Sequence, residues 1–370
     1  MIKLSLCMIV KNEEAVLERC LESAAGKNNR QENPTDEIII ADTGSTDGTK
    51  KIAEAYGAKI YDFPWKNDFS AARNFAFSKA TGDYILWLDA DDYISDEARK
   101  KLFALKKRLS ETGAPAAFCR YEIAAYSSPA APTVTAFYRT RIVKNDGSAV
   151  WKGRVHECLP RYENALTEPE NGFCVRHLGS EKPRGTRNLD IYRAQISEKE
   201  PLSPRDLFYY GRELFYHGFY TEADAIEEKF IARPDGWYVN KIEARKIQSA
   251  CREATGNEAG AADALFSTFS YGAPRAGVLC ALGRIFKRKN DFSSAYFWYL
   301  SAYNAKDHSA EGDFENPDER GAIPLIEAVY CAYSAGEKAE ARKLHEECMR
   351  LYPDRPAVKY NDAFFDTHPD

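Results

Sequence analysis

Residues 84–92 read Tyr-Ile-Leu-Trp-Leu-Asp-Ala-Asp-Asp, an apolar run that ends in three carboxylates. The apolar part has the length of a buried strand. At this spacing Asp89, Asp91 and Asp92 repel one another unless a cation or hydrogen-bond donors compensate their charge. Side chains two apart on a strand point the same way, so we expect Asp89 and Asp91 to share one site. Carboxylate oxygens are natural ligands of Mg²⁺ and Mn²⁺, and the segment therefore predicts a divalent-metal and phosphate site at a strand end.

A second reading of these acids is that they only begin the next helix. That helix already has an N-cap residue in Ser95, followed by Asp96 and Glu97 in its first turn. The metal reading is therefore favoured over the capping reading.

Short apolar runs alternate with helical patterns around this segment. The runs are residues 4–10, 37–41, 58–61 and 84–88, and the helical patterns close near Gly26, Gly57 and Gly82. Such alternation predicts right-handed crossovers and a mostly parallel sheet. Ligands of such sheets bind beyond the carboxyl ends of the strands. Val10, Asp42 and Asp89 all lie at such ends, so three segments are expected to bring polar groups to one edge.

Four blocks of this region resemble the motifs of family 2 glycosyltransferases. The blocks are SLCMIVKNEE (5–14), ADTGSTDGT (41–49), SAARN (70–74) and LDADD (88–92). The chain also resembles a bacterial subgroup that couples this domain to tetratricopeptide repeats and includes enzymes that glycosylate bacteriocin peptides. Two further blocks of that subgroup are WKGRVHE (151–157) and HLG (177–179). The resemblance implies an α/β GT-A domain that transfers sugars from nucleotide diphosphates, followed by an all-α tetratricopeptide-like domain.

The resemblance also implies a nucleotide-sugar site across the strand ends. The loop after Val10, with Lys11 and Glu13, would contact the base. Asp42 would accept a hydrogen bond from uracil N3 or a ribose hydroxyl, and its alternative role is an Asx turn that caps the following loop. Arg73 would approach the base or the diphosphate, or be an exposed helix residue.

The same resemblance assigns the metal ligands. Asp91 would hold Mn²⁺ or Mg²⁺, with Asp89 in the same set and also on the ribose. His177 is a candidate third ligand, because a late histidine has this role in some GT-A enzymes. A lone histidine is more often a structural residue, so both readings of His177 remain open.

Residues 151–159 are expected to form a strand, and the resemblance to the family implies that this segment closes over the sugar end of the donor. Within it, Glu157 would lie on the face opposite Arg154 and His156. Transfer with inversion needs one base on the far side of the anomeric carbon, and Glu157 is the candidate, with His156 next. The alternative for Glu157 is a surface carboxylate paired with an arginine.

Residues 181–200 are polar and basic, and include Lys182 and Arg187. Near an anionic diphosphate such a segment could act as a lid that orders on donor binding. It could equally be a solvated linker between domains. The expected division of the chain is a GT-A domain over 1–180, this segment, and a helical domain over 201–370.

An internal repeat is visible in the last part of the chain. A glycine or asparagine is followed five residues later by alanine in four places: Gly218–Ala223, Gly256–Ala261, Asn290–Ala295 and Gly336–Ala341. The intervals of 38, 34 and 46 residues bracket the tetratricopeptide period, and the longest contains an insertion around Lys306–Asp318. Four helix pairs of this kind would bury a continuous core and leave a concave face.

Composition narrows the possible functions. With 51 basic and 56 acidic residues the net charge is −5, which argues against a general binder of nucleic acid or membrane surfaces. Nine cysteines without a C-x-x-C pair suggest neither a zinc site nor a disulfide framework. No run approaches the length of a transmembrane helix, and we expect a cytoplasmic protein without a membrane anchor.

The resemblance thus implies a metal-dependent, inverting glycosyltransferase, with a UDP-sugar as the expected donor and a hexose as the expected sugar. The helical half would bind a peptide or protein acceptor, form a homodimer, or do both. One alternative is a catalytically degenerate scaffold that binds a protein partner. A nucleotidyltransferase is disfavoured, because the loop after the first strand (10–14) contains no glycine.

Overall fold

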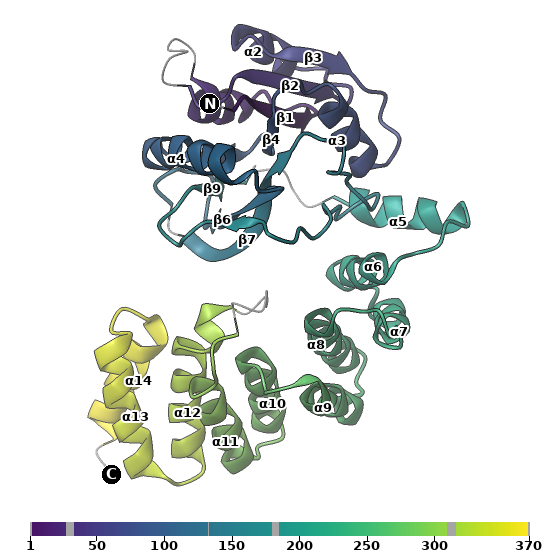
Figure 1. Ribbon diagram of the computed structural model, residues 1–370. Helices are drawn as coiled ribbons and strands as arrows, with labels where there is room; N and C mark the ends of the chain where they lie inside the picture. The colour runs from purple at the N-terminus through teal and green to yellow at the C-terminus, as the bar shows by residue number, and fades with distance from the viewer. Residues whose placement is uncertain (1, 27–32, 132, 180–184, 309–315, 369–370) are drawn as a thin grey trace. The chain divides into compact units, whose positions relative to one another are not determined.

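The computed structural model describes residues 2–26, 33–131, 133–179, 185–308 and 316–368. The chain divides into two compact units, Met1–Lys199 and Glu200–Asp370. Each unit is described by itself (Figure 1).

The first unit is built on one mixed sheet, in which the described residues contribute nine strands. The strand order is β3-β2-β1-β4-β7-β6-β9-β5, with β8 beside β6. The strands are β1 Leu4–Val10, β2 Glu37–Asp42, β3 Lys59–Asp62, β4 Tyr84–Trp87, β5 Asp92–Tyr93, β6 Ala116–Ala124, β7 Thr133–Lys144, β8 Leu166–Thr167 and β9 Cys174–His177. Strand β1 is parallel to β2 and β4, and β2 is parallel to β3, as the alternating pattern predicts. Strand β7 runs antiparallel to β4 and makes the sheet mixed.

Helices cover both faces of this sheet (Figure 1). Leu6 and Met8 of β1 belong to a core with the apolar sides of two helices, α1 and α4, while Cys7 faces the opposite core with α3. Because successive side chains of a strand point to opposite faces, β1 is buried on both sides, as expected of a central parallel strand. The helices of this unit are α1 Leu17–Ala25, α2 Thr49–Ala55, α3 Phe69–Ser78, α4 Asp96–Thr112 and α5 Arg187–Ser197. The Ser95 side chain caps α4 by accepting a hydrogen bond from the Ala98 amide.

The strand expected over residues 151–159 is absent from the structure, which is a correction to the sequence prediction. Lys152 and Cys158 form an isolated bridge and exchange backbone hydrogen bonds of 3.0 Å. Between them Gly153 has a φ of +95° and His156 a φ of +51°. Left-handed residues cannot continue an extended strand, so the segment is a closed loop. The positions of His156 and Glu157 follow from this loop and not from strand alternation.

The second unit is a stack of helices in which most neighbours in the chain are also neighbours in space (Figure 1). Its helices are α6 Pro204–Tyr216, α7 Tyr220–Ile231, α8 Tyr238–Ala254, α9 Glu258–Ser267, α10 Ala276–Arg288, α11 Phe292–Tyr303, α12 Ala322–Ser334, α13 Lys338–Leu351 and α14 Pro356–Thr367, with 3-10 helices η2 Thr268–Tyr271 and η4 Pro317–Glu319. None of the helices in the described residues is long and apolar enough to span a membrane.

The repeat read from the sequence sets the turns of this stack. The four turn residues have φ values of +79°, +82°, +58° and +89° at Gly218, Gly256, Asn290 and Gly336. The four alanines are completely buried, at Ala223, Ala261, Ala295 and Ala341. Only glycine and, at a smaller cost than other residues, asparagine adopt this backbone readily, and a small side chain lets the helices approach closely. The all-α, repeat-like architecture of this half is confirmed.

Candidate active site

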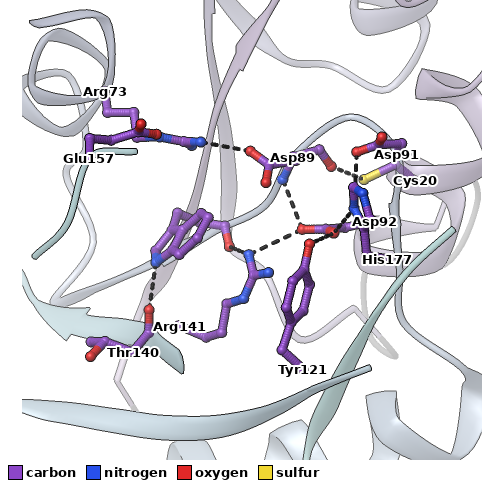
Figure 2. Close-up of polar contacts among 11 residues, drawn as sticks. Cys20, Arg73, Asp89, Asp91, Asp92, Tyr121, Thr140, Arg141, Glu157 and His177 are labelled. Carbon is purple, nitrogen blue, oxygen red and sulfur yellow. Dashed lines mark hydrogen bonds and ion pairs between the residues drawn. The ribbon is translucent and has the colours of Figure 1, made fainter. Parts of the chain in front are cut away.

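Asp89 and Asp92, which follow β4, each have a guanidinium partner (Figure 2). Arg73 Nη2 donates to Asp89 Oδ1 at 2.7 Å, and Arg141 Nη1 donates to Asp92 Oδ2 at 3.1 Å. The second pair is completely buried. Burial opposes the charge of Asp89, but Arg73 and then Arg141 outweigh it and hold the pKa of Asp89 well below its ordinary value. Cations within the chain therefore compensate these two carboxylates.

Asp91 lies in a different environment. Its Oδ1 atom is 3.4 Å from Nδ1 of His177, and Asp92 Oδ1 is 3.3 Å from the same nitrogen. Burial raises the pKa of Asp91 to about 6; the charges of Asp89 and Asp92 add to this rise, and His177 offsets only part of it. Ligand atoms of Asp91, Asp92 and His177 all lie within 4.8 Å of one another. A divalent cation would supply the positive charge needed to compensate the Asp91 carboxylate, so this donor set fits Mn²⁺ or Mg²⁺.

Asp92 is the buried centre of this cluster (Figure 2). The Tyr121 hydroxyl donates to its Oδ1 at 3.0 Å, and the Asp89 amide donates to its Oδ2 at 2.9 Å. We expected Asp89 and Asp91 to share the metal site, but the structure groups Asp91 with Asp92 and His177 and turns Asp89 toward Arg73. The physical reason is that β4 ends at Trp87, so the alternation of a strand does not extend to Asp89.

Arg73 joins Asp89 to Glu157. Its Nε atom donates to Glu157 Oε1 at 2.6 Å, and its guanidinium lies 4.9 Å from the ring centroids of both Trp87 and Trp151. Burial opposes the positive charge, but Asp89 and then Glu157 outweigh it, and the pKa of Arg73 lies above its ordinary value. The three charged groups form one continuous chain, so the exposed-helix alternative for Arg73 does not describe it.

Helix α3 holds the 151–158 loop in the position that makes this chain possible. Asn74, next to Arg73, donates through Nδ2 to the Trp151 carbonyl at 3.0 Å and accepts from the Trp151 amide at 2.8 Å. The Phe69 amide donates to the Arg154 carbonyl at 2.7 Å. The side chain of Glu157 is only 12% exposed and pairs with Arg73. It is therefore not a carboxylate on the open surface, which was the alternative role considered for it.

His156 points to a different neighbour from Glu157. Its ring stacks near that of Tyr192 on α5, with centroids 6.4 Å apart and an interplanar angle of 18°. Arg154 forms an ion pair with Glu198, the residue that follows α5. The loop therefore contacts both helices: Glu157 contacts Arg73 of α3, and the adjacent His156 lies beside Tyr192 of α5. Half of the segment expected as a linker or lid is thus an ordered helix.

Val10 and Asp42 are direct neighbours at the ends of β1 and β2. The Asp42 side chain is buried, and its Oδ1 accepts from the amides of Gly44 and Ser45 at 3.0 and 2.9 Å. This is the Asx-turn arrangement. Its other oxygen, Oδ2, is buried and has no hydrogen-bond partner among the described residues.

The remaining expected donor-site residues are more dispersed. Lys11 is exposed, and the Glu13 amide donates to Thr49 Oγ1 at 2.8 Å, which ties the loop after β1 to α2. Arg187, at the start of α5, has its guanidinium 4.7 Å from the Phe69 ring centroid. Lys182 lies outside the described residues.

Sequence reasoning missed three parts of the site: the central role of Asp92, and the contributions of Tyr121 and Arg141. Arg141 belongs to β7, where Arg139-Thr140-Arg141 interrupts a run of uncharged residues. Two arginines at alternate positions of a strand share one face, and a buried face with two cations calls for carboxylates opposite it. That pattern is the signal that could have linked β7 to residues 89–92.

Comparisons with known proteins identify the family of the first unit. Residues 5–147 match the family model described as Glycosyl transferase family 2, so the first unit carries a glycosyl transferase family 2 domain. The SPbeta prophage-derived glycosyltransferase SunS of Bacillus subtilis is 31% identical over 240 residues, which cover 60% of this chain and 50% of that protein. A TPR repeat-containing protein of Synechococcus elongatus is 48% identical over 102 residues, 28% of this chain and 24% of that protein. The chain thus spans at most about half the length of these relatives.

Similarity to solved structures is weaker. The crystal structure of S. aureus TarS aligns with 70% of this chain and 55% of that chain, with a TM-score of 0.41 and 15% identity. The family 2 assignment therefore applies to the matched residues 5–147 of the first unit. The chain combines this family 2 domain with a tetratricopeptide-like helical unit.

Proposed function

We propose that the protein is a metal-dependent, inverting glycosyltransferase that moves a sugar from a UDP-sugar to an acceptor side chain. The observation that carries the proposal is the cluster of Asp91, His177 and the Glu157–Arg73–Asp89 chain within a domain of this family. These groups come from α3, from the residues after β4, from the 151–158 loop and from β9. Such convergence of charged groups from distant segments at strand ends is typical of an active site.

The nucleoside would lie against the ends of β1 and β2. An unpartnered buried carboxylate oxygen is costly, and a ligand that donates to it removes that cost. Asp42 Oδ2 is such an atom, and an imide N–H of the base or a ribose hydroxyl is a suitable donor. Asp89, which Arg73 keeps ionised, would accept from the ribose.

Asp91 and His177 would hold the metal ion, and Asp92 would orient His177 as a positioning residue. A divalent cation supplies charge that stabilises the leaving diphosphate, typically by several kcal/mol. Tyr121 donates to the Asp92 oxygen that faces His177, and Arg141 donates to the other oxygen. Both residues fix the carboxylate, so the histidine ring has a defined direction before any ligand binds.

Glu157 would accept the acceptor's proton. Arg73 donates to Oε1, and Oε2 has no hydrogen bond within the described part of the chain. As the acceptor oxygen or sulfur bonds to the anomeric carbon, the bond from that carbon to the diphosphate oxygen breaks, and the proton moves to Oε2. A positioned base of this kind typically contributes about 10²- to 10⁴-fold.

We propose that the helical unit binds a polypeptide acceptor, associates with a second copy, or does both. Supporting this, a cavity of about 500 Å³ lies among α10, α11 and α12. Its lining includes Ile323 and Tyr330, which are 39% and 49% exposed, and Lys287, whose ammonium lies 4.5 Å from the Tyr330 ring centroid. The lining also includes charged side chains, among them Arg284 and Glu327. A cavity in a helical stack with both aromatic and charged lining is suited to side chains of an extended or helical peptide.

The test is release of nucleoside diphosphate from a panel of UDP-, GDP-, ADP- and dTDP-sugars by the full chain. We expect at least one UDP-sugar to be turned over and to raise the melting temperature. A protein that binds a polypeptide but neither binds nor hydrolyses any donor would support the degenerate-scaffold alternative and overturn this proposal.

A further inference from the structure

Three guanidinium groups surround one buried tryptophan ring. The Cζ atoms of Arg141, Arg73 and Arg139 lie 3.9, 4.9 and 5.0 Å from the ring centroid of Trp87. Arg141 and Arg139 also lie 4.1 and 5.4 Å from the ring centroid of Tyr121. The ring faces attract these cations, but the cations repel one another, so the cluster needs nearby anions.

Two of the three arginines have those anions within the chain. Arg73 is paired with Asp89 and Glu157, and Arg141 is paired with Asp92. Arg139 contacts the two aromatic rings, and we find no hydrogen bond or ion pair for it anywhere in the described residues. Burial, and then the charge of Arg141, lower the pKa of Arg139 from its ordinary value. Arginine nonetheless stays charged in proteins, so Arg139 is a partly buried cation without a carboxylate of its own.

On strand β7, Arg139 lies between a buried residue and an exposed one. Arg139 lies two residues before Arg141, and Phe137 two residues before Arg139, so all three share one face of the strand. Arg141 is completely buried, Arg139 is partly exposed, and Phe137 is 37% exposed. The Phe137 ring packs edge-on against Tyr121 at 5.5 Å. Along this face the exposure of the side chains rises from Arg141, beside the carboxylate cluster, to Phe137 at the surface. Arg139 lies between the two.

We propose that Arg139 binds a phosphate of the donor's diphosphate; this inference rests on the proposed function and adds a binding residue to the same site. The guanidinium fork matches two phosphate oxygens and forms charge-assisted hydrogen bonds with them. Asp89 and Glu157 are already occupied by Arg73 and Asp92 by Arg141, so an added anion is the partner that Arg139 lacks. Arg139 lies close enough to Asp89 for the charges of the two residues to act on each other. A diphosphate bound beside residues 89–91 would bring a further anion to the same cluster.

The test compares ligands that differ only in phosphate number. Calorimetry in the presence of Mn²⁺ would measure binding of UDP, UMP and uridine to the full-length protein and to its Arg139→Gln and Arg139→Lys variants. We expect Arg139→Gln to weaken UDP binding at least about tenfold, to affect UMP less and uridine hardly at all, and Arg139→Lys to recover part of the loss. Arg120→Gln is the matched control, because Arg120 lies on the adjacent strand β6 and pairs with Glu170 at 2.7 Å.

Three other binding or transfer results would overturn the inference about Arg139, and one would contradict the proposed function. Binding of UDP that is unchanged in Arg139→Gln overturns the inference, and so does an equal loss for UDP and uridine, because the residue would then support the fold or the base. Normal UDP binding with a selective loss of transfer to or from acidic substrates would assign Arg139 to a carboxylate and also overturn it. Failure of the unmodified protein to bind any of UDP, GDP, ADP or dTDP would contradict the proposed function itself.

Discussion

Arg73 Nε donates to Glu157 Oε1 at 2.6 Å, although the two residues lie 84 positions apart in the chain. The contact exists because α3 carries Arg73 and Asn74 side by side, and Asn74 fixes the loop that ends in Glu157. One short helix thereby joins the expected base, through Arg73, to Asp89, which follows β4.

The Glu157 carboxylate is expected to be needed for the chemical step and not for donor binding. Glu157→Gln keeps the shape of the side chain but cannot accept a proton. We predict that kcat with a hydroxyl acceptor falls at least about a hundredfold while the Kd for UDP changes less than about threefold. If kcat is nearly unchanged, the base lies elsewhere, and His156→Gln is the next variant to measure.

Asp91 and Asp92 should respond in opposite ways to the same substitution. Asp92→Asn leaves Arg141 buried without its counter-charge, and we predict a loss of about 3–5 kcal/mol in stability. Asp91→Asn removes a carboxylate that burial already disfavours, so the apo protein should be at least as stable as the unmodified one. Its stabilisation by Mn²⁺ should disappear. Thermal unfolding with and without Mn²⁺ measures both effects, and equal destabilisation by the two substitutions would contradict these separate roles.

Glu227 predicts a pH-dependent stability in the helical unit. It is completely buried against Gly211, and neither carboxylate oxygen has a hydrogen-bond partner in the described chain. Burial, and then Glu243, raise the pKa of Glu227 well above its ordinary value, and Arg212 offsets only part of the rise. The folded state therefore binds this proton more tightly than the unfolded state does. The contribution is complete below the unfolded pKa of about 4.3 and is lost as the pH rises toward the folded value.

Glu227→Gln should remove this dependence. Relative to the unmodified protein, we expect the variant to gain stability near pH 8 and to lose that advantage near pH 5. Thermal unfolding at the two pH values checks this, with Glu222→Gln at an exposed position of the same helix as the control. A difference between the Glu227→Gln and unmodified proteins that does not change with pH would show that the group is not protonated in the folded state.

The cavity of the helical unit should affect transfer and not donor hydrolysis. Tyr330→Ala removes a ring that contacts Lys287 and Phe292 at the cavity, and transfer to a library of peptides containing Ser, Thr and Cys should fall at least about tenfold. Tyr360→Ala, at a residue that is 73% exposed on α14 and does not line the cavity, serves as the control. Equal transfer by both variants would mean that acceptors bind elsewhere.

The sequence predicts best those features that local chemistry determines. The ends of β1 and β2 follow from apolar runs that stop at polar residues, and the helical turns follow from glycine or asparagine five residues before alanine. Both signals are local, because a single residue's backbone preference or polarity determines each.

The parts that were missed depend on contacts between distant segments. The 151–158 loop reads as a strand because Val155 alternates with polar residues, and only its backbone hydrogen bonds and the Asn74 contacts make it a loop. Asp92 reads like its neighbours Asp89 and Asp91, and its burial depends on Arg141 and Tyr121 from other strands. Sequence spacing cannot distinguish these carboxylates, because their difference lies in which guanidinium reaches them.

Metal dependence of donor turnover tests the central claim most directly. Release of UDP from the preferred UDP-sugar should be measured with Mn²⁺ or Mg²⁺, with excess chelator, and after restoring the metal, for the unmodified protein and for Asp91→Asn. We predict turnover that chelator abolishes and metal restores in the unmodified protein, and none in the variant under any condition. Full turnover in excess chelator, or a fully active Asp91→Asn variant, would contradict the account.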